Sequence, residues 1–351
     1  SPSRSNPEGQ PWGYPVFHPE KVYADGSAPA RWPVEAPEPE PGPVLRFLDA
    51  RFLRAFRGYD ALRVDHPHGL VCPWVYRADA QDPHRALRQG ARLLSSPDLE
   101  YHPALAEWSI PSPEQIDRRR ERWAENRVGA LSGDQVLRYG VLLERALLAA
   151  EASTGSRQRL VCEVLSTMPH PLQRVMARHG MGRFRVTHKA SLTDPLDVYR
   201  AENACAEDWV MLTTQDTPPI WQVIARWRET GEIRERAAHL AARLAPPGGR
   251  REALERELRD EDTALATGML AELLASEARH VLVFFTDLLG IEEPYNRPGV
   301  QDARNWTLRA PRLGVPGCPA PPLDVPRACA LALRARGIDA PALLEALEAP
   351  V

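Results

Sequence analysis

The sequence is poor in the features that mark membrane and nucleic-acid proteins. Its 351 residues contain no run of about 18 apolar residues, the length that a transmembrane helix requires. Lysine and arginine total 44 against 47 aspartates and glutamates, so the formal net charge is -3 and no excess of basic side chains is available to bind phosphates. We therefore expect no membrane and no nucleic-acid partner.

Cysteines are few and scattered. They are five in number, and no two of them form a Cys-x-x-Cys pair: Cys72, Cys162, Cys205, Cys318 and Cys329. This pattern argues against a disulfide framework and against a zinc-binding knuckle. A reducing cytoplasm is the simplest compartment for such a chain, and we expect no metal site.

Short apolar runs alternate with amphipathic patterns along the chain. Apolar residues at helical spacing predict helices at 44–59, 136–150, 172–179, 327–336 and 341–347, and helical material over about 220–279. Short apolar runs predict strands at 61–64, 160–162, 184–186, 209–212 and 281–285. A mixed-charge stretch at 114–127 is expected to be a solvated helix. The alternation predicts an α/β fold with a parallel sheet, either open or closed into a barrel.

Four of the five predicted strands lead into an acidic residue: Asp65, Glu163, Asp216 and Asp287. An aspartate after a strand is often only a helix cap, which is the favoured interpretation of Asp287. However, the carboxyl ends of the strands of a (β/α)8 barrel converge on one face, where catalytic groups gather. The recurrence therefore favours a TIM-type (β/α)8 barrel with a shared acidic site.

The first three acids suit retaining glycosyl transfer. In that reaction one carboxylate attacks the anomeric carbon, and a second carboxyl group about 5 to 5.5 Å away protonates the leaving oxygen. A third acid, here Asp216, can hold sugar hydroxyls and favour the transition state. Arg63 lies two residues before Asp65, on the same side of a strand, and would keep it ionised. The apolar residues before Glu163 are expected to raise its pKa toward that of a working acid.

Several segments resemble one enzyme family. Arg63-Val64-Asp65-His66 is similar to the R-[IV]-D-H segment of amylomaltases and related 4-α-glucanotransferases, family 77 of the glycoside hydrolases. Cys162-Glu163-Val164-Leu165 resembles the acid/base motif of that family. Gly9-Gln10-Pro11-Trp12-Gly13 resembles its G-Q-x-W-G loop beside the substrate groove, and 287–306 resembles its D-L-[LF]-G, N-x-P-G and N-W stretch. The similarity runs, with gaps, from about Gly9 to Pro311.

The resemblance implies a 4-α-glucanotransferase that moves segments of maltooligosaccharides or α-glucan by double displacement. Asp65 would be the nucleophile, Glu163 the acid/base and Asp216 the group that stabilises the transition state. Sugar contacts would come from Gln10, Trp12, Arg63, His66, Gln215, Asn296 and Gly299. No cofactor is needed, because the carboxylates and sugar hydroxyls supply the chemistry.

Simpler interpretations exist for some of these residues. Trp12 is either a sugar-stacking platform or ordinary loop packing. His66 and His68 form an H-x-H pair without a third metal ligand at useful spacing, so a sugar contact by His66 is favoured. Cys162 is interpreted as a small core residue, and Asn296 as a loop-shaping residue that also touches sugar.

The sequence departs from the family pattern at three positions. Val164 stands where aspartate is common, Gln215 where histidine usually precedes the third acid, and Val300 where threonine is usual. Glutamine can donate a hydrogen bond to a sugar hydroxyl but cannot carry charge. The change at Gln215 falls at the predicted subsite of the cleaved sugar.

The family order places the five predicted strands as the last five of the barrel, with the first three expected before Ser1. We therefore predict one catalytic barrel domain over 1–351, with a helical insertion at about 78–150 and a helical subregion at about 220–279. An N-terminal segment or a second chain would complete the barrel. A non-catalytic α-glucan-binding or assembly subunit stays open as an alternative function, and so does an α-glucan hydrolase with the same carboxylates.

Overall fold

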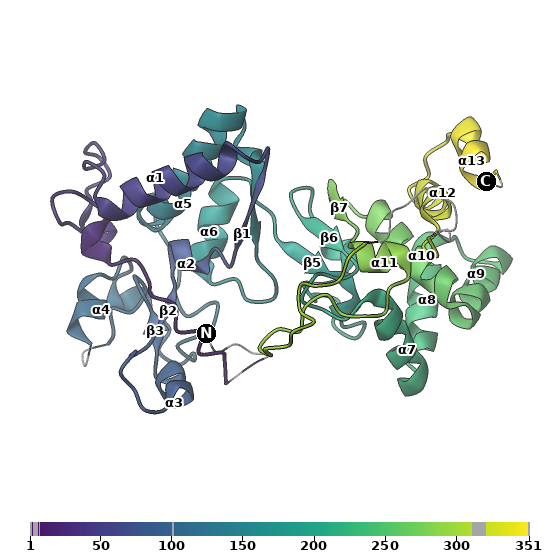
Figure 1. Ribbon diagram of the computed structural model, residues 1–351, viewed down its shortest axis with the longest axis horizontal. Helices are drawn as coiled ribbons and strands as arrows, with labels where there is room; N and C mark the ends of the chain where they lie inside the picture. The colour runs from purple at the N-terminus through teal and green to yellow at the C-terminus, as the bar shows by residue number, and fades with distance from the viewer. Residues whose placement is uncertain (1, 3–5, 7, 100–101, 311–320, 350–351) are drawn as a thin grey trace. The chain divides into compact units, whose positions relative to one another are not determined.

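The helices and strands fall into two units, Ser1–Met181 and Gly182–Val351, in the computed structural model of the chain (Figure 1). The structure describes all residues except 1, 3–5, 7, 100–101, 311–320 and 350–351. Cys318 and Pro311 therefore lie outside the described residues. Within the described part, no helix combines the length and the apolar character needed to cross a membrane.

Two parallel strands form the centre of the first unit. β1 (Leu62–Asp65) pairs with β4 (Leu160–Glu163) in a register that sets Asp65 beside Glu163. The remaining elements of this unit are η1 (Pro19–Lys21), η2 (Pro29–Arg31), α1 (Pro43–Phe56), α2 (His68–Val71), β2 (Trp74–Val75), α3 (Pro83–Arg88), β3 (Ala91–Arg92), α4 (Pro103–Glu107), η3 (Pro113–Gln115), α5 (Gly133–Thr154), η4 (Arg157–Arg159) and α6 (His170–Arg178). β2 and β3 form a separate antiparallel pair.

Helix α5 organises the core of the first unit. It begins with a capping box, in which Ser132 and Gln135 satisfy each other's backbone N–H groups, and it ends at Gly155 in the left-handed conformation. Its long buried face packs against α1, α2, α6 and β4, and α1 runs beside it in Figure 1. This packing fixes the strand pair from behind and leaves the strand ends to carry polar side chains.

The second unit contains a three-stranded parallel sheet with the order β5-β6-β7. Its strands are β5 (Phe184–Val186), β6 (Trp209–Met211) and β7 (His280–Leu282). Its helices are η5 (Thr187–Lys189), η6 (Ala201–Asn203), α7 (Ile220–Thr230), α8 (Ile233–Leu244), α9 (Gly249–Asp260), α10 (Asp262–Ala275), α11 (Phe285–Leu289), α12 (Val325–Ala335) and α13 (Pro341–Glu348).

Helix α10 is the core of the second unit. All of its residues from Ala264 to Leu273 are buried, as expected for a helix that is apolar on nearly every side. It contacts α7, α8, α9 and α12, which surround it in Figure 1. Glu272 is thus a carboxylate inside an otherwise apolar, buried helix.

The predicted α/β class and the five predicted strands are confirmed, and the strands pair in parallel. Among the described residues, β1 and β4 form one hydrogen-bonded sheet, and β5, β6 and β7 form another. The assignment of these strands as the last five of one barrel is therefore not confirmed, and the single barrel domain stays a prediction. The fifth strand is shorter than expected, since it ends at Leu282 and Phe285 already begins α11.

The helix predicted over 114–127 is wrong. Only the 3-10 turn Pro113–Gln115 forms, followed by turns. The two ends of this segment pair with each other instead: Asp117 N donates to Arg127 O (2.9 Å) and Gly129 N donates to Gln115 O (2.7 Å). The Asp117 side chain also accepts a hydrogen bond from Arg119 N, a local bond that competes with helix formation.

Candidate active site

The two acids at the ends of β1 and β4 form the centre of the site. Asp65 and Glu163 are register partners on adjacent parallel strands, so their side chains point to the same side of the sheet. Their exposure differs greatly: the Asp65 side chain is 64% exposed, whereas that of Glu163 is 5% exposed. The pair thus joins a carboxylate in solvent to a carboxyl group that is almost buried.

Arg63 bridges the two acids. Its Nη2 lies 3.0 Å from Asp65 Oδ1 and 2.7 Å from Glu163 Oε1. Strand alternation explains this position, because residues 63 and 65 project from the same face of β1. The predicted contact of Arg63 with Asp65 is present, and the contact with Glu163 adds to it.

Burial and charge drive the two acids to different protonation states. The neighbouring His66 side chain, the Glu163 carboxyl group and the Arg63 charge hold the pKa of Asp65 well below its usual range. Burial, followed by the nearby Asp65 carboxylate, raises the pKa of Glu163 to about 7. Near neutral pH the site therefore contains an ionised Asp65 beside a Glu163 that can hold a proton, the combination of nucleophile and general acid.

His66 adopts an uncommon backbone conformation. Its φ of 48° lies in the left-handed region, which non-glycine residues rarely occupy. The Nδ1 atom lies 3.8 Å from Asp65 Oδ2 and 3.6 Å from Glu163 Oε2, and the Asp65 carboxylate raises the pKa of the imidazole. Uncommon conformations of this kind are concentrated at functional sites, and the imidazole of His66 lies beside both acids.

A cavity of about 760 Å³ in the first unit opens beside these acids. Its size suits an oligosaccharide-sized ligand. Aromatic side chains line much of it: Trp12, Tyr14, Phe17, Phe47, Phe52, Trp74 and Tyr76. Asp65, His66 and Glu163 line the same cavity, so we call it the acid groove.

The predicted loop residues Gln10 and Trp12 also line the acid groove. Trp12 Nε1 donates to Gln10 Oε1 (2.7 Å), and the indole packs edge to face on His66 with the ring centroids 5.3 Å apart. Gly13 N donates to the hydroxyl oxygen of Tyr76 (2.9 Å), which holds the loop in place. Sequence analysis did not find Tyr76, because no motif or periodicity marks it.

A second group of predicted residues gathers in the second unit. Asp216 accepts two side-chain hydrogen bonds, from Gln215 Nε2 (2.7 Å) and from Asn296 Nδ2 (2.5 Å). Asn296 N also donates to Gln215 O (3.1 Å), so the two loops are joined by backbone as well as side chains. Gly299 follows in the second loop with a φ of 76°, the left-handed region that favours glycine. A shared site of Asp216 with Asp65 and Glu163 stays a prediction.

Asp287 is a structural residue. Its carboxylate is completely buried and accepts hydrogen bonds from Thr213 Oγ1 (2.5 Å) and from Ile220 N (2.8 Å), the first residue of α7. The predicted cap of the helix that follows its strand is wrong: Asp287 lies inside that helix, α11, and its carboxylate caps the first turn of α7 instead. Burial raises the pKa of Asp287 to about 6.

The neighbours of Glu163 face the core. Cys162 is 2% exposed and Val164 is fully buried, both within the apolar core of the first unit. The interpretation of Cys162 as a core residue is confirmed, and burial raises the pKa of its thiol to about 12. His68 is not a ligand partner for His66: it is half-buried, it donates through Nε2 to Thr167 O (2.9 Å), and desolvation lowers its pKa to about 3.

Ligand atoms of Asp65, His66 and Glu163 lie within 4.8 Å of one another, a spacing that a metal ion could use. The Arg63 guanidinium, however, contacts both carboxylates directly and already supplies the opposite charge. This arrangement therefore favours an acid pair with an internal counter-charge over a cation site.

A comparison with known protein families finds one match. A family model described as 4-alpha-glucanotransferase, glycoside hydrolase family 77, matches residues 45–314. Among solved structures, the chain is similar to the amylomaltase from Streptococcus agalactiae in complex with acarbose (15% identity, TM-score 0.45), over 74% of this chain and 39% of that one. It is also similar to the amylomaltase from Corynebacterium glutamicum (18% identity, TM-score 0.48), over 75% of this chain and 33% of that one. The chain thus spans well under half the length of these neighbours. Among curated protein sequences, none matches the chain.

Proposed function

This chain belongs to the 4-alpha-glucanotransferase family, and from that premise we propose that it transfers α-1,4-glucan segments between maltooligosaccharides. The observation that carries the proposal is the pair formed by Asp65 and Glu163. They are adjacent in the sheet register, Arg63 bridges them, and their pKa values are driven apart. We place this activity in the cytoplasm, as cysteine usage predicts.

In the first half of the proposed reaction, Asp65 attacks the anomeric carbon of the donor sugar. The bond from that carbon to the departing oxygen breaks, and Glu163 gives its proton to this oxygen. The products are a glycosyl ester on Asp65 and a shortened glucan with a free hydroxyl group. The ionised state of Asp65 and the pKa of about 7 of Glu163 suit these two roles.

In the second half, Glu163 takes a proton from the 4-hydroxyl group of an acceptor sugar. The acceptor oxygen attacks the anomeric carbon, the ester bond to Asp65 breaks, and configuration is retained after two inversions. His66 and Arg63 would keep Asp65 ionised as the ester breaks, since both lie beside its carboxylate.

The acid groove is the proposed binding site for the sugars. Trp12 is 52% exposed and Tyr14 is 78% exposed, so both offer aromatic faces against which sugar rings can pack. Asp216, oriented by Gln215 and Asn296, is the proposed third carboxylate, which would hold sugar hydroxyls in the transition state. An acceptor sugar in the groove would also exclude water and favour transfer over hydrolysis.

A non-catalytic α-glucan-binding subunit is the second candidate. The observation that favours it is Gln215, which stands in contact with Asp216 where the family resemblance predicts histidine. Glutamine can keep Asp216 oriented, but it cannot supply positive charge. Such a subunit would bind sugars in the acid groove without catalysing their transfer.

Incubation with maltotriose tests the proposal. Glucose together with maltopentaose and longer chains, absent with Asp65→Asn, would support transfer through Asp65. Glucose and maltose without longer products would replace the transferase with a hydrolase. Binding of maltooligosaccharides by calorimetry without any products would favour the binding subunit.

A further inference from the structure

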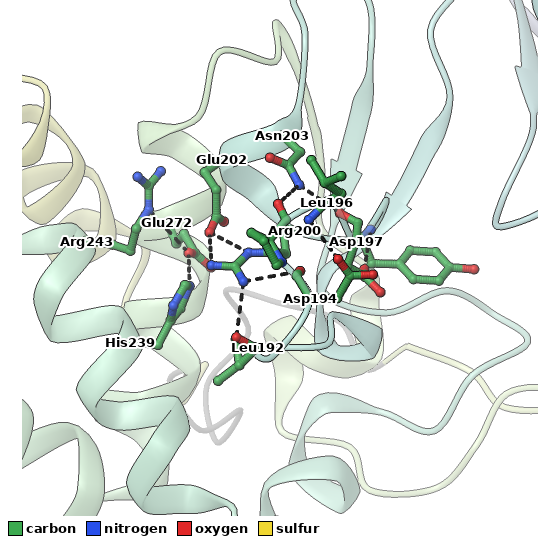
Figure 2. A network of polar contacts seen from close by, with 12 residues as sticks. Leu192, Asp194, Leu196, Asp197, Arg200, Glu202, Asn203, His239, Arg243 and Glu272 are labelled. Carbon is green, nitrogen blue, oxygen red and sulfur yellow. Dashed lines mark hydrogen bonds and ion pairs between the residues drawn. The ribbon is translucent and has the colours of Figure 1, made fainter.

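A second cluster of ligand-type side chains lies in the second unit, apart from any residue assigned to the proposed reaction. It consists of Glu202 on η6, His239 on α8 and Glu272 on α10. One nitrogen or oxygen atom from each residue lies within 4.8 Å of the other two. Figure 2 shows the two carboxylates and the imidazole pointing toward one another.

One buried oxygen indicates that this cluster is incomplete as it stands. Glu202 Oε2 is buried and, among the described residues, has no hydrogen-bond partner. Glu272 is 7% exposed on the apolar helix α10, where its neighbours are His239 Nε2 at 3.0 Å and Arg243 Nε at 3.7 Å from Oε1. A buried carboxylate oxygen without a partner costs free energy. A cation beside Glu202 Oε2 would remove this cost.

A small cavity connects the three side chains. Its volume is about 20 Å³, and Glu202, His239 and Glu272 line it together with Thr187 and Met269. This space holds about one water molecule or one ion and no larger ligand. The chemistry that fits is therefore a single small species that accepts electron pairs from oxygen and nitrogen.

Arginines surround the cluster, but Glu202 Oε2 has no hydrogen bond with any of the described residues. Arg200 also lines the cavity; it binds Glu202 through Oε1 and donates to the carbonyl oxygens of Leu192 and Asp194 (Figure 2). Arg236 also lines the cavity, but its guanidinium lies over the Trp227 ring, 4.5 Å from the centroid. Partners of this kind orient ligand side chains from outside a metal site.

We infer that Glu202, His239 and Glu272 form a binding site for a divalent transition-metal ion of the zinc class. One imidazole nitrogen and two carboxylate oxygens are common zinc ligands, and a water molecule would complete a tetrahedron. Zinc–ligand distances of about 2.0 to 2.2 Å require the three atoms to approach one another slightly. The ion would replace the His239–Glu272 hydrogen bond and give Glu202 Oε2 a partner. Since η6, α8 and α10 are distant in sequence, the ion would join three elements of the unit.

Zinc titration of the untagged chain, first stripped with a chelator, tests this inference without any measurement of activity. Binding would be followed by competition with a fluorescent zinc indicator. We expect one site that His239→Asn weakens at least about tenfold, the least expected from loss of a direct ligand. Glu202→Gln should weaken it in the same direction, and circular dichroism would show that each variant is folded.

His66→Asn is the matched control, because it removes the histidine of the other carboxylate–histidine cluster. Zinc binding that persists in His66→Asn and falls in His239→Asn supports the site. Zinc binding that falls only in His66→Asn, or no binding by the wild-type chain at 100-fold excess zinc, overturns it and leaves a water molecule as the occupant. In crystals soaked with zinc, an anomalous peak between the three side chains would be independent support, and its absence there would count against the site. Neither result depends on whether the chain transfers glucan.

Discussion

Asp65 and Asp287 look alike in the sequence and differ completely in the structure. Each follows a short apolar run in a predicted strand. The Asp65 side chain is 64% exposed and lies beside a second acid and a cavity of about 760 Å³. Asp287 is fully buried and accepts hydrogen bonds from Thr213 and Ile220. The difference teaches that an acid after a strand can serve chemistry or architecture, and that its hydrogen-bond partners distinguish the two.

The electrostatics separate the two aspartates as clearly as the contacts do. Charged and polar neighbours lower the pKa of Asp65, and burial raises that of Asp287. A group that must attack as an anion needs the first environment. A group that only accepts backbone and hydroxyl hydrogen bonds tolerates the second.

The largest expected effect comes from Asp65→Asn. An amide cannot form the glycosyl ester, so we expect transfer activity to fall by at least about 10³-fold, in the range seen when catalytic groups are removed. The free energy of unfolding should change by less than about 1 kcal/mol, since the side chain is mostly exposed. Product analysis from maltotriose and urea unfolding would measure the two quantities. A variant that keeps its activity would show that Asp65 is not the nucleophile.

Asp287→Ala should mainly lower stability, whereas Asp65→Asn should mainly lower activity. The substitution leaves Ile220 N–H and the Thr213 hydroxyl group buried without their acceptor, which is expected to lower the free energy of unfolding by about 2 to 4 kcal/mol. Thr286→Ala, at the neighbouring buried position, is the control for lost packing, because it removes no acceptor from α7. Urea unfolding of both variants would give the comparison. Equal losses in the two variants would contradict the capping role.

Asp287→Asn tests how the free energy of unfolding depends on the protonation of Asp287. The pKa of Asp287 rises from 3.8 to about 6 on folding, so the folded state binds this proton more tightly than the unfolded state. The stabilisation from this proton is complete below pH 3.8 and is lost as the pH rises through 6. Relative to Asp287→Asn, the wild type should therefore lose about 2 kcal/mol between pH 4 and pH 7. A pH-independent difference in urea unfolding would mean that Asp287 does not titrate in this window.

The loss of the Glu163 proton should set the alkaline limb of the pH–rate profile. With a pKa of about 7, the acid loses its proton as the pH rises, and kcat/KM should fall about tenfold per pH unit above 7. The low pKa of Asp65 should leave no acidic limb above about pH 4 from that residue. Arg63 lowers the pKa of Glu163, so Arg63→Met should move the alkaline limb to higher pH. An unchanged limb in that variant would assign the titration to another group.

Much of the fold could be predicted because local patterns determine it. The capping box at Ser132 and the apolar spacing that follows mark α5, and the short apolar runs mark all five parallel strands. The stretch 114–127 could not be predicted in the same way. Its charges suit a solvated helix, but the pairing of its ends through Asp117, Gln115 and Gly129 depends on contacts that no local pattern encodes.

Part of the site could likewise be predicted from the sequence, and part could not. The motif residues Arg63, Asp65 and Glu163 could be named from sequence, since strand alternation and the family resemblance both mark them. The contact of Tyr76 with the Gly13 backbone could not, because it joins segments 63 residues apart. The cluster of Glu202, His239 and Glu272 could not be predicted for the same reason, since three separate helices bring its members together.

The smallest expected effect tests whether the aromatic lining of the acid groove belongs to the function of Asp65. Trp12 contacts His66 and is half exposed, so Trp12→Ala should remove a sugar-binding face without altering the acid pair. We expect KM for maltotriose to rise about three- to tenfold with kcat nearly unchanged, the result expected when ground state and transition state lose the same contact. Tyr59→Ala is the matched control, because Tyr59 is 68% exposed and is not among the residues that line the groove. A fall in kcat at constant KM would instead assign Trp12 to the positioning of His66, and equal effects of the two variants would remove Trp12 from the site.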